Sequence, residues 1–155
     1  MYFVDKIKNE YKDEKVLIFV DMDGVIADYN FGFKLDFKNK RPLKTNIVVF
    51  KELSLLNNVE LNILSICKKN SQIDDKNDWL DTFAPFFKSE NRIIISKENN
   101  PNISSKELKC NYLKNYILQN NHKKIIVIDD DNDILFYLSK NLNEIILYQD
   151  SSIID

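Results

Sequence analysis

Residues 16–28 read VLIFVDMDGVIAD. The first five are apolar and rich in β-branched side chains, which is typical of a strand buried on both faces of a parallel sheet. Asp21 and Asp23 follow at the expected end of that strand, just before Gly24, one of only two glycines in the chain. Ligands of doubly wound sheets bind beyond the carboxyl ends of the strands. The stretch therefore predicts an α/β fold with a site at this edge.

Four further apolar runs follow, at 61–66, 92–95, 124–128 and 144–148. Apolar residues at helical spacing separate them, over about 48–56, 78–83, 104–117 and 134–142, and residues 1–14 predict a short helix packed on the outside. Ser104 or Ser105 is the expected cap of the helix before the fourth run. Strands alternating with helices predict one domain over residues 1–155. Its fold is expected to be Rossmann-like and doubly wound, with a mostly parallel five-stranded sheet and helices on both faces.

The composition agrees with one folded domain. The chain has 155 residues, 44% of them hydrophobic, and a net charge of −2, which excludes a disordered protein and gives no overall field for nucleic acid. No apolar run has the length of a membrane span, and the first residues lack a signal-peptide layout, so a soluble, cytoplasmic protein is expected. Cys67 and Cys110 lie far apart without neighbouring ligands, which predicts reduced thiols.

The fourth apolar run also ends in acid, with DDDND at 129–133. Two acidic strand ends side by side concentrate negative charge, which a divalent cation with oxygen ligands offsets, most often Mg²⁺. The second run places the hydroxyl of Ser65 at the same edge, and Lys106 and Lys109 lie near the start of the helix before the fourth run. A carboxylate nucleophile, an acid/base carboxylate, a hydroxyl, a lysine and a metal together suit phosphoryl transfer.

Three of these stretches resemble motifs of the haloacid dehalogenase (HAD) superfamily of phosphohydrolases. DMDGVIAD at 21–28 resembles the first motif, ILS at 63–65 the second and IDDDND at 128–133 the fourth. They occur in the family's order and span the chain, which makes the match more specific than any one of them. The resemblance implies a Mg²⁺-dependent phosphatase that acts through an aspartyl-phosphate.

Residue by residue, the resemblance implies the following roles. Asp21 is the nucleophile and a metal ligand. Asp23 is the general acid/base and a metal ligand through its backbone carbonyl. Ser65 donates to the phosphate, and Asp129 and Asp130 complete the metal site.

The family's third motif is a lysine near a helix start. Lys109 is preferred, because KCNYL at 109–113 looks like the run that precedes the acidic strand in some small members. Lys106, one turn earlier, is the alternative.

Within the superfamily, DMDGVIADYN at 21–30 is close to the opening of 5′(3′)-deoxyribonucleotidases. KNDWL at 76–80, followed by Ala84 and Pro85, resembles a stretch that those enzymes carry after their second motif. This likeness implies a nucleoside monophosphate as the substrate. Residues 29–47 are left to form a small cap insertion after the first strand, shorter than the nucleotidase cap.

One stretch keeps alternatives open. Residues 34–44 hold five basic side chains against one acid, with Phe31, Phe33 and Phe37 in or just before them; they either bind a nucleotide or a nucleic-acid end or form a solvated face. Trp79 is interpreted as a core residue. The expected partner is a small phosphorylated substrate, a nucleotide before nucleic acid, and no membrane. The alternatives are a phosphatase of a larger partner such as a polynucleotide end, and a non-catalytic binding module that keeps the fold and the metal.

Overall fold

A computed structural model describes residues 2–29, 36–120 and 123–154. Its centre is one five-stranded sheet in the order β3-β2-β1-β4-β5, with every neighbouring pair parallel. The strands are β1 (Val16–Val20), β2 (Val59–Cys67), β3 (Arg92–Ser96), β4 (Lys124–Asp129) and β5 (Ile145–Gln149). The Rossmann-like α/β fold is thus confirmed, and the sheet is wholly rather than mostly parallel.

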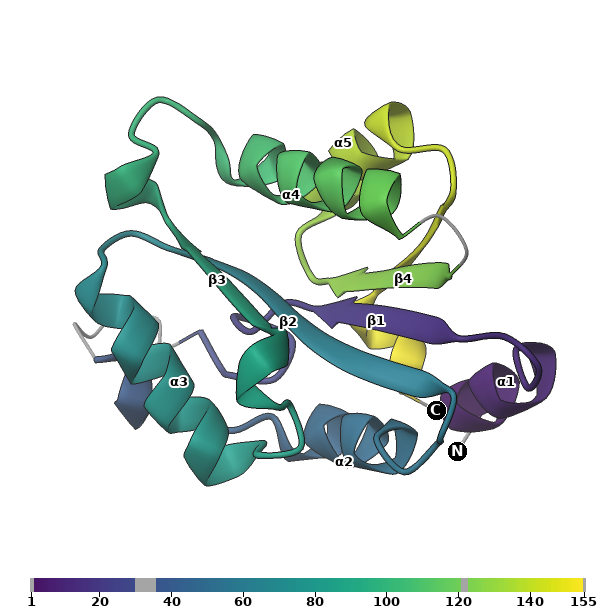
Figure 1. The fold of residues 1–155 in the computed structure, drawn as a ribbon. Coiled ribbons are helices and arrows are strands. Elements are labelled where there is room, and N and C mark those ends of the chain that lie inside the picture. The colour runs from purple at the N-terminus through teal and green to yellow at the C-terminus, as the bar shows by residue number, and fades with distance from the viewer. Residues whose placement is uncertain (1, 30–35, 121–122, 155) are drawn as a thin grey trace.

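Helices cover both faces of the sheet (Figure 1). One face carries α1, α2 and α3, and the other carries α4 and α5. Their bounds are α1 (Tyr2–Glu10), α2 (Lys44–Leu53), α3 (Ser71–Phe83), α4 (Ser105–Gln119) and α5 (Asn132–Asn141). No helix of the described residues is long and apolar enough to cross a membrane.

The sheet separates two apolar cores because successive strand side chains point to opposite faces. In β1, Val16, Ile18 and Val20 pack on the face of α1 to α3, whereas Leu17 and Phe19 pack on the face of α4 and α5. All five side chains are fully buried. β1 is therefore the centre of the fold, and the groups that follow it are held on a rigid support.

Some boundaries differ from the expectation. α2 begins at Lys44 and ends at Leu53, because the leucines that follow form the turn into β2, and Leu55 is 75% exposed. The N-terminal helix belongs to the core and is not only an outer layer, since Phe3 and Ile7 are buried and Phe3 meets the Tyr148 ring edge-on.

The expected cap is described only in part. Residues 30–35 of the expected cap lie outside the described residues, and so does His122, which falls between α4 and β4 in the sequence. Phe37–Asn39 form a 3-10 turn, and the last residues of the expected cap are the first turn of α2. Both cysteines are free thiols, as expected.

Candidate active site

The carboxyl ends of β1 and β4 lie side by side because these strands pair. Val20 is in register with Ile128, and the backbone N–H of Asp21 donates to the Ile128 carbonyl at 3.0 Å. Asp129 is the last residue of β4. Asp21 and Asp129 are 9% and 1% exposed, so two acidic side chains from distant parts of the chain meet in a nearly buried place.

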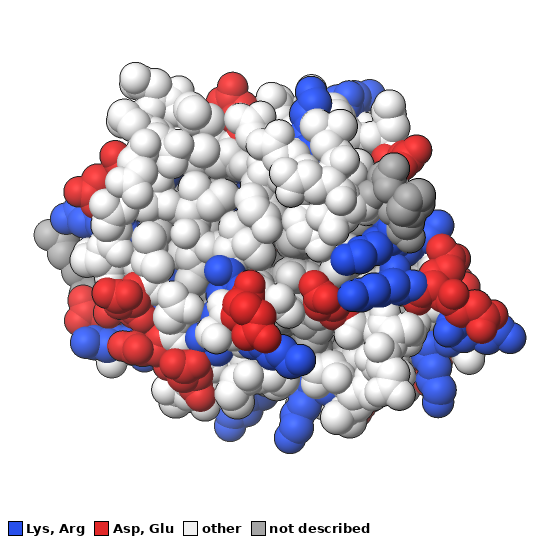
Figure 2. Space-filling view, viewed as in Figure 1, with Lys and Arg blue, Asp and Glu red and all other residues white. Residues whose placement is uncertain are grey.

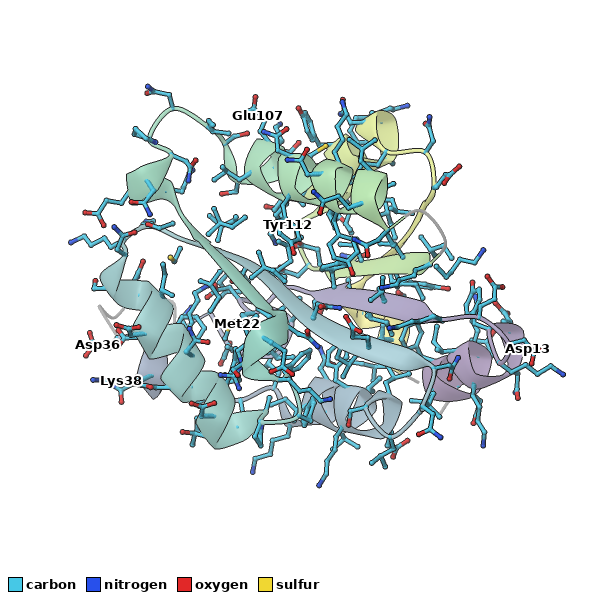
Figure 3. All side chains as sticks on the ribbon, viewed as in Figure 1. Asp13, Met22, Asp36, Lys38, Glu107 and Tyr112 are labelled. Atoms are coloured by element: carbon cyan, nitrogen blue, oxygen red, sulfur yellow. The ribbon has the colours of Figure 1, made fainter. Side chains whose placement is uncertain are left out.

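A tight turn carries the chain from Asp21 to Asp23. The side chain of Met22 is fully buried in the core beneath the sheet (Figure 3). Its carbonyl accepts three successive backbone N–H groups, those of Val25, Ile26 and Ala27, at 3.2, 3.0 and 2.9 Å. Because Met22 anchors the turn, the aspartates on either side of it both stay at the strand-end edge.

Gly24 is required by the close packing of this turn. Its φ of 77° lies in the left-handed region, and a Cβ there would lie 2.2 Å from Oδ2 of Asp130 and 2.4 Å from the Tyr29 ring. The Tyr29 hydroxyl donates to the same Asp130 oxygen at 2.6 Å. Only glycine allows this backbone conformation and this approach together.

Three carboxylates at this edge fit a metal ion. Asp21, Asp129 and Asp130 each offer an oxygen within 4.8 Å of the others. Oδ1 of Asp130 is buried and has no hydrogen-bond partner among the described residues, an arrangement that is unfavourable unless a donor or cation satisfies it. Clustered carboxylate oxygens are the ligands that hard divalent cations prefer.

Burial raises the pKa of all three carboxyls. The pKa of Asp21 rises to about 6 because burial outweighs the attraction of Lys109, and the charge of Asp129 adds to the rise. Burial likewise raises the pKa of Asp129 and of Asp130, where the charge of Asp21 contributes. These carboxyls therefore bind protons more readily than exposed ones do, and a metal would compete with those protons.

Lys109 bridges two of these carboxylates. Its Nζ lies 2.6 Å from Oδ2 of Asp129 and 3.0 Å from Oδ1 of Asp21, and its side chain is 3% exposed. A capping box between Ser104 and Glu107 starts α4 and sets the turn that carries Lys109. Burial alone would lower the pKa of Lys109, but Asp21 and Asp129 outweigh it and raise the pKa, so the side chain stays an ammonium.

The Asp23 carboxylate faces a different set of groups. Lys76 of α3 donates from Nζ to Asp23 Oδ2 at 2.8 Å, to Ser65 Oγ at 2.7 Å and to the Ile66 carbonyl at 3.1 Å. Ser65 and Lys76 are buried. Burial would raise the pKa of Asp23, but Lys76 and Lys40 lower it. The pKa values of two aspartates only two positions apart are thus shifted in opposite directions.

Lys40 is the second cation on Asp23 and comes from the segment before α2. Its ammonium contacts Asp23 Oδ1 and lies 4.8 Å from the centre of the Phe37 ring. Trp79, buried as expected, donates from Nε1 to the Lys40 carbonyl at 2.9 Å. α3 therefore positions both lysines, one directly and one through the backbone of the segment.

No protein-family model and no curated protein matches the sequence. A solved structure matches in fold. A chain in the structure of the Pnkp1/Rnl/Hen1 RNA repair complex aligns with a TM-score of 0.67 and 13% sequence identity, over 88% of this chain and 42% of that one. At this identity the likeness concerns the fold alone, and the chain spans less than half of that neighbour's length.

The structure brings together every residue that the sequence singled out for the site, except Lys106. The Lys106 ammonium instead pairs with Asp133 at 3.0 Å on the surface. The Asp23 carboxylate lies outside the cluster of three carboxylates, so its expected metal contact through the backbone carbonyl stays a prediction. Lys76 and Lys40 were not among the predicted catalytic or metal-binding residues, although KNDWL and the basic stretch 34–44 contain them.

Proposed function

We propose that the protein is a Mg²⁺-dependent phosphomonoesterase that acts through an aspartyl-phosphate, as its resemblance to HAD phosphohydrolases implies. One observation carries the proposal. Asp21 lies within a carboxylate cluster bridged by Lys109, while Asp23 lies apart and is held by Lys76 and Lys40. Phosphoryl transfer to a carboxylate needs one group that attacks and another that moves the proton.

In the first half-reaction, a carboxylate oxygen of Asp21 attacks phosphorus and the bond from phosphorus to the leaving oxygen breaks. Asp23 gives that oxygen a proton. In the second, Asp23 takes a proton from water, the water oxygen attacks phosphorus, and the bond to Asp21 breaks to release phosphate. The lysines on Asp23 favour its ionised form, which accepts this proton. The proton that Asp23 gives to the leaving oxygen is then the one it took from water in the preceding turnover.

In this mechanism Ser65 and Lys109 would donate hydrogen bonds to phosphoryl oxygens, which stabilises charge that develops during transfer. Asp21, Asp129 and Asp130 would hold the Mg²⁺, which supplies positive charge against those oxygens. A cavity of about 160 Å³ is lined by Asp21, Asp23, Lys109, Asp129 and Asp130 but not by the buried Ser65. At roughly 30 Å³ per water, it has room for a phosphoryl group with its cation.

The favoured substrate is a nucleoside monophosphate, and the phosphorylated end of a polynucleotide is the second candidate. The cavity is smaller than the roughly 300–1,000 Å³ of sites that enclose a drug-sized ligand, which favours a leaving group that extends beyond it. The structural neighbour belongs to an RNA repair complex, so phosphorylated oligonucleotides belong among the compounds tested.

Phosphate release from nucleotides, sugar phosphates and phosphorylated oligonucleotides tests the proposal. Asp21→Asn removes the attacking oxygen while keeping shape, and we expect it to lower kcat at least about a thousandfold. Asp133→Asn is the matched control, because that side chain is 70% exposed, and it should retain the wild-type rate. Chelation should stop turnover and Mg²⁺ restore it. Wild-type turnover by Asp21→Asn would contradict the mechanism.

A further inference from the structure

The two lysines on Asp23 differ in how firmly they are held. The Lys76 side chain is 2% exposed and donates to Ser65 and the Ile66 carbonyl as well as to Asp23. The Lys40 side chain is 16% exposed, and its ammonium contacts Asp23 Oδ1. A group that approaches Asp23 from solvent therefore displaces Lys40 before Lys76.

The backbone of Lys40 is fixed, while its ammonium contacts Asp23 and its side chain is partly exposed. The Lys40 carbonyl accepts from Trp79 Nε1 at 2.9 Å, and its N–H donates to the Phe37 carbonyl at 3.0 Å. The Tyr29 and Phe37 ring centres lie 5.8 and 4.8 Å from the ammonium. Aromatic faces attract a cation, so Lys40 stays nearby after it leaves Asp23.

The surroundings of Lys40 limit where an anion can bind. Residues 36–44 carry four basic side chains against one acid, and the neighbouring Arg41 is 81% exposed and pairs with Asp28 at 2.8 Å. The adjoining helix α3 has the opposite charge, because Asp74, Asp78 and Asp81 are exposed on it, and Figure 2 shows acidic side chains gathered there. An anionic group is thus favoured close to Lys40 and opposed farther along α3.

We propose that Lys40 is a specificity residue that binds a second phosphate, carried by the leaving group of the substrate within a few bonds of the leaving oxygen. This rests on the proposed function, in which Asp23 meets that oxygen. On binding, the ammonium moves from Asp23 to the second phosphate, which frees Asp23 Oδ1 for the leaving oxygen. Nucleoside bisphosphates and short 5′-phosphorylated oligonucleotides share this chemistry.

The test is a ratio of kcat/KM values measured with Mg²⁺ on the full chain. The substrates are a nucleoside 5′-monophosphate, the 3′,5′-bisphosphate of the same nucleoside, and a 5′-phosphorylated dinucleotide that begins with it. We expect the kcat/KM of at least one substrate with two phosphates to exceed that of the monophosphate roughly tenfold, the scale of one charge-assisted hydrogen bond. The one with the larger ratio identifies the source of the second phosphate.

Two variants assign the preference to a residue. Lys40→Gln should bring the ratio to about one. Lys38→Gln makes the same charge change at an exposed position at the outer edge of the molecule (Figure 3) and should keep the wild-type ratio. A wild-type ratio of one would overturn the inference. A ratio that stays unchanged in Lys40→Gln, because all substrates slow equally, would overturn it too.

A binding measurement separates this inference from the proposed function. Calorimetry measures the dissociation constants of the same compounds. The wild-type protein is used if it releases no phosphate from them, and Asp21→Asn is used if it does. The second-phosphate site is supported if the bisphosphate binds more tightly than the monophosphate and Lys40→Gln abolishes that difference. This holds even if the wild-type protein hydrolyses none of the compounds and the proposed function fails. Equal binding of the monophosphate and the compounds with two phosphates rejects the site.

Discussion

Replacing Lys109 by methionine tests the charge balance of the carboxylate cluster. Methionine keeps the length of the side chain and removes the ammonium that lies 2.6 Å from Asp129 and 3.0 Å from Asp21. Removing one partner of a buried ion pair costs about 3–5 kcal/mol, because the remaining charge stays buried. We expect the free energy of unfolding to fall by that amount in buffer containing a chelator.

Lys106→Met is the matched control on the same helix. The Lys106 side chain is 35% exposed and its partner Asp133 is 70% exposed, and an exposed pair contributes about 0–1 kcal/mol. Urea unfolding followed by circular dichroism measures both variants. With a slope of about 2 kcal/mol per molar urea, Lys109→Met should move the midpoint by roughly 2 M and Lys106→Met by less than about 0.5 M. Equal midpoints would refute the reasoning.

Magnesium gives the same variant a second readout. Without the ammonium, Asp21, Asp129 and Asp130 have less positive charge near them, so they should bind a divalent cation more tightly. A ligand that binds the folded state stabilises it in proportion to the logarithm of its concentration over Kd. Added Mg²⁺ should therefore raise the unfolding midpoint of Lys109→Met more than that of the wild-type protein. A smaller rise would mean that the cation does not bind at these carboxylates.

Two further predictions concern the same cluster. Gly24→Ala should lower the free energy of unfolding by about 1–2 kcal/mol, because alanine is strained at a left-handed φ. It should also weaken the Mg²⁺-induced rise in Tm, because its Cβ would collide with Asp130; a full Mg²⁺ response in thermal melts would contradict this. The pKa of Asp21 is raised from 3.8 to about 6, so its proton stabilises the metal-free fold below pH 3.8, and this contribution is lost as the pH rises through about 6. Because Mg²⁺ competes with that proton, its effect on Tm should grow over the same pH range, and melts that show a constant effect from pH 5 to 7.5 would argue against the site.

The fold could be predicted because each strand corresponds to a short apolar run in the sequence. Residues 16–20 contribute side chains to both cores, and burial on both faces requires the continuous run seen in the sequence. Helix ends were less predictable. Leu55 and Leu56 continue the apolar spacing of α2, yet they belong to the turn that leads into β2, and spacing alone does not distinguish the two.

The site was predictable where it depends on strand ends and less so elsewhere. Asp21 and Asp129 follow from the ends of β1 and β4. Lys76 stood out only as the first residue of KNDWL, although it precedes the buried Trp79 and Leu80 by three and four positions and so shares their helix face. Lys40 stood out only as one of the basic side chains of residues 34–44, since its segment has no periodicity and is placed by a hydrogen bond from α3.

The pairing of β1 with β4 has a kinetic consequence. The hydroxyl of Tyr29 and the carboxylate of Asp130 touch across 101 positions of sequence, so the carboxylate cluster forms only after a long loop has closed. Such closure is entropically costly, and distant parallel pairings form slowly. We therefore expect a cation held by the finished cluster to slow unfolding more than it speeds folding.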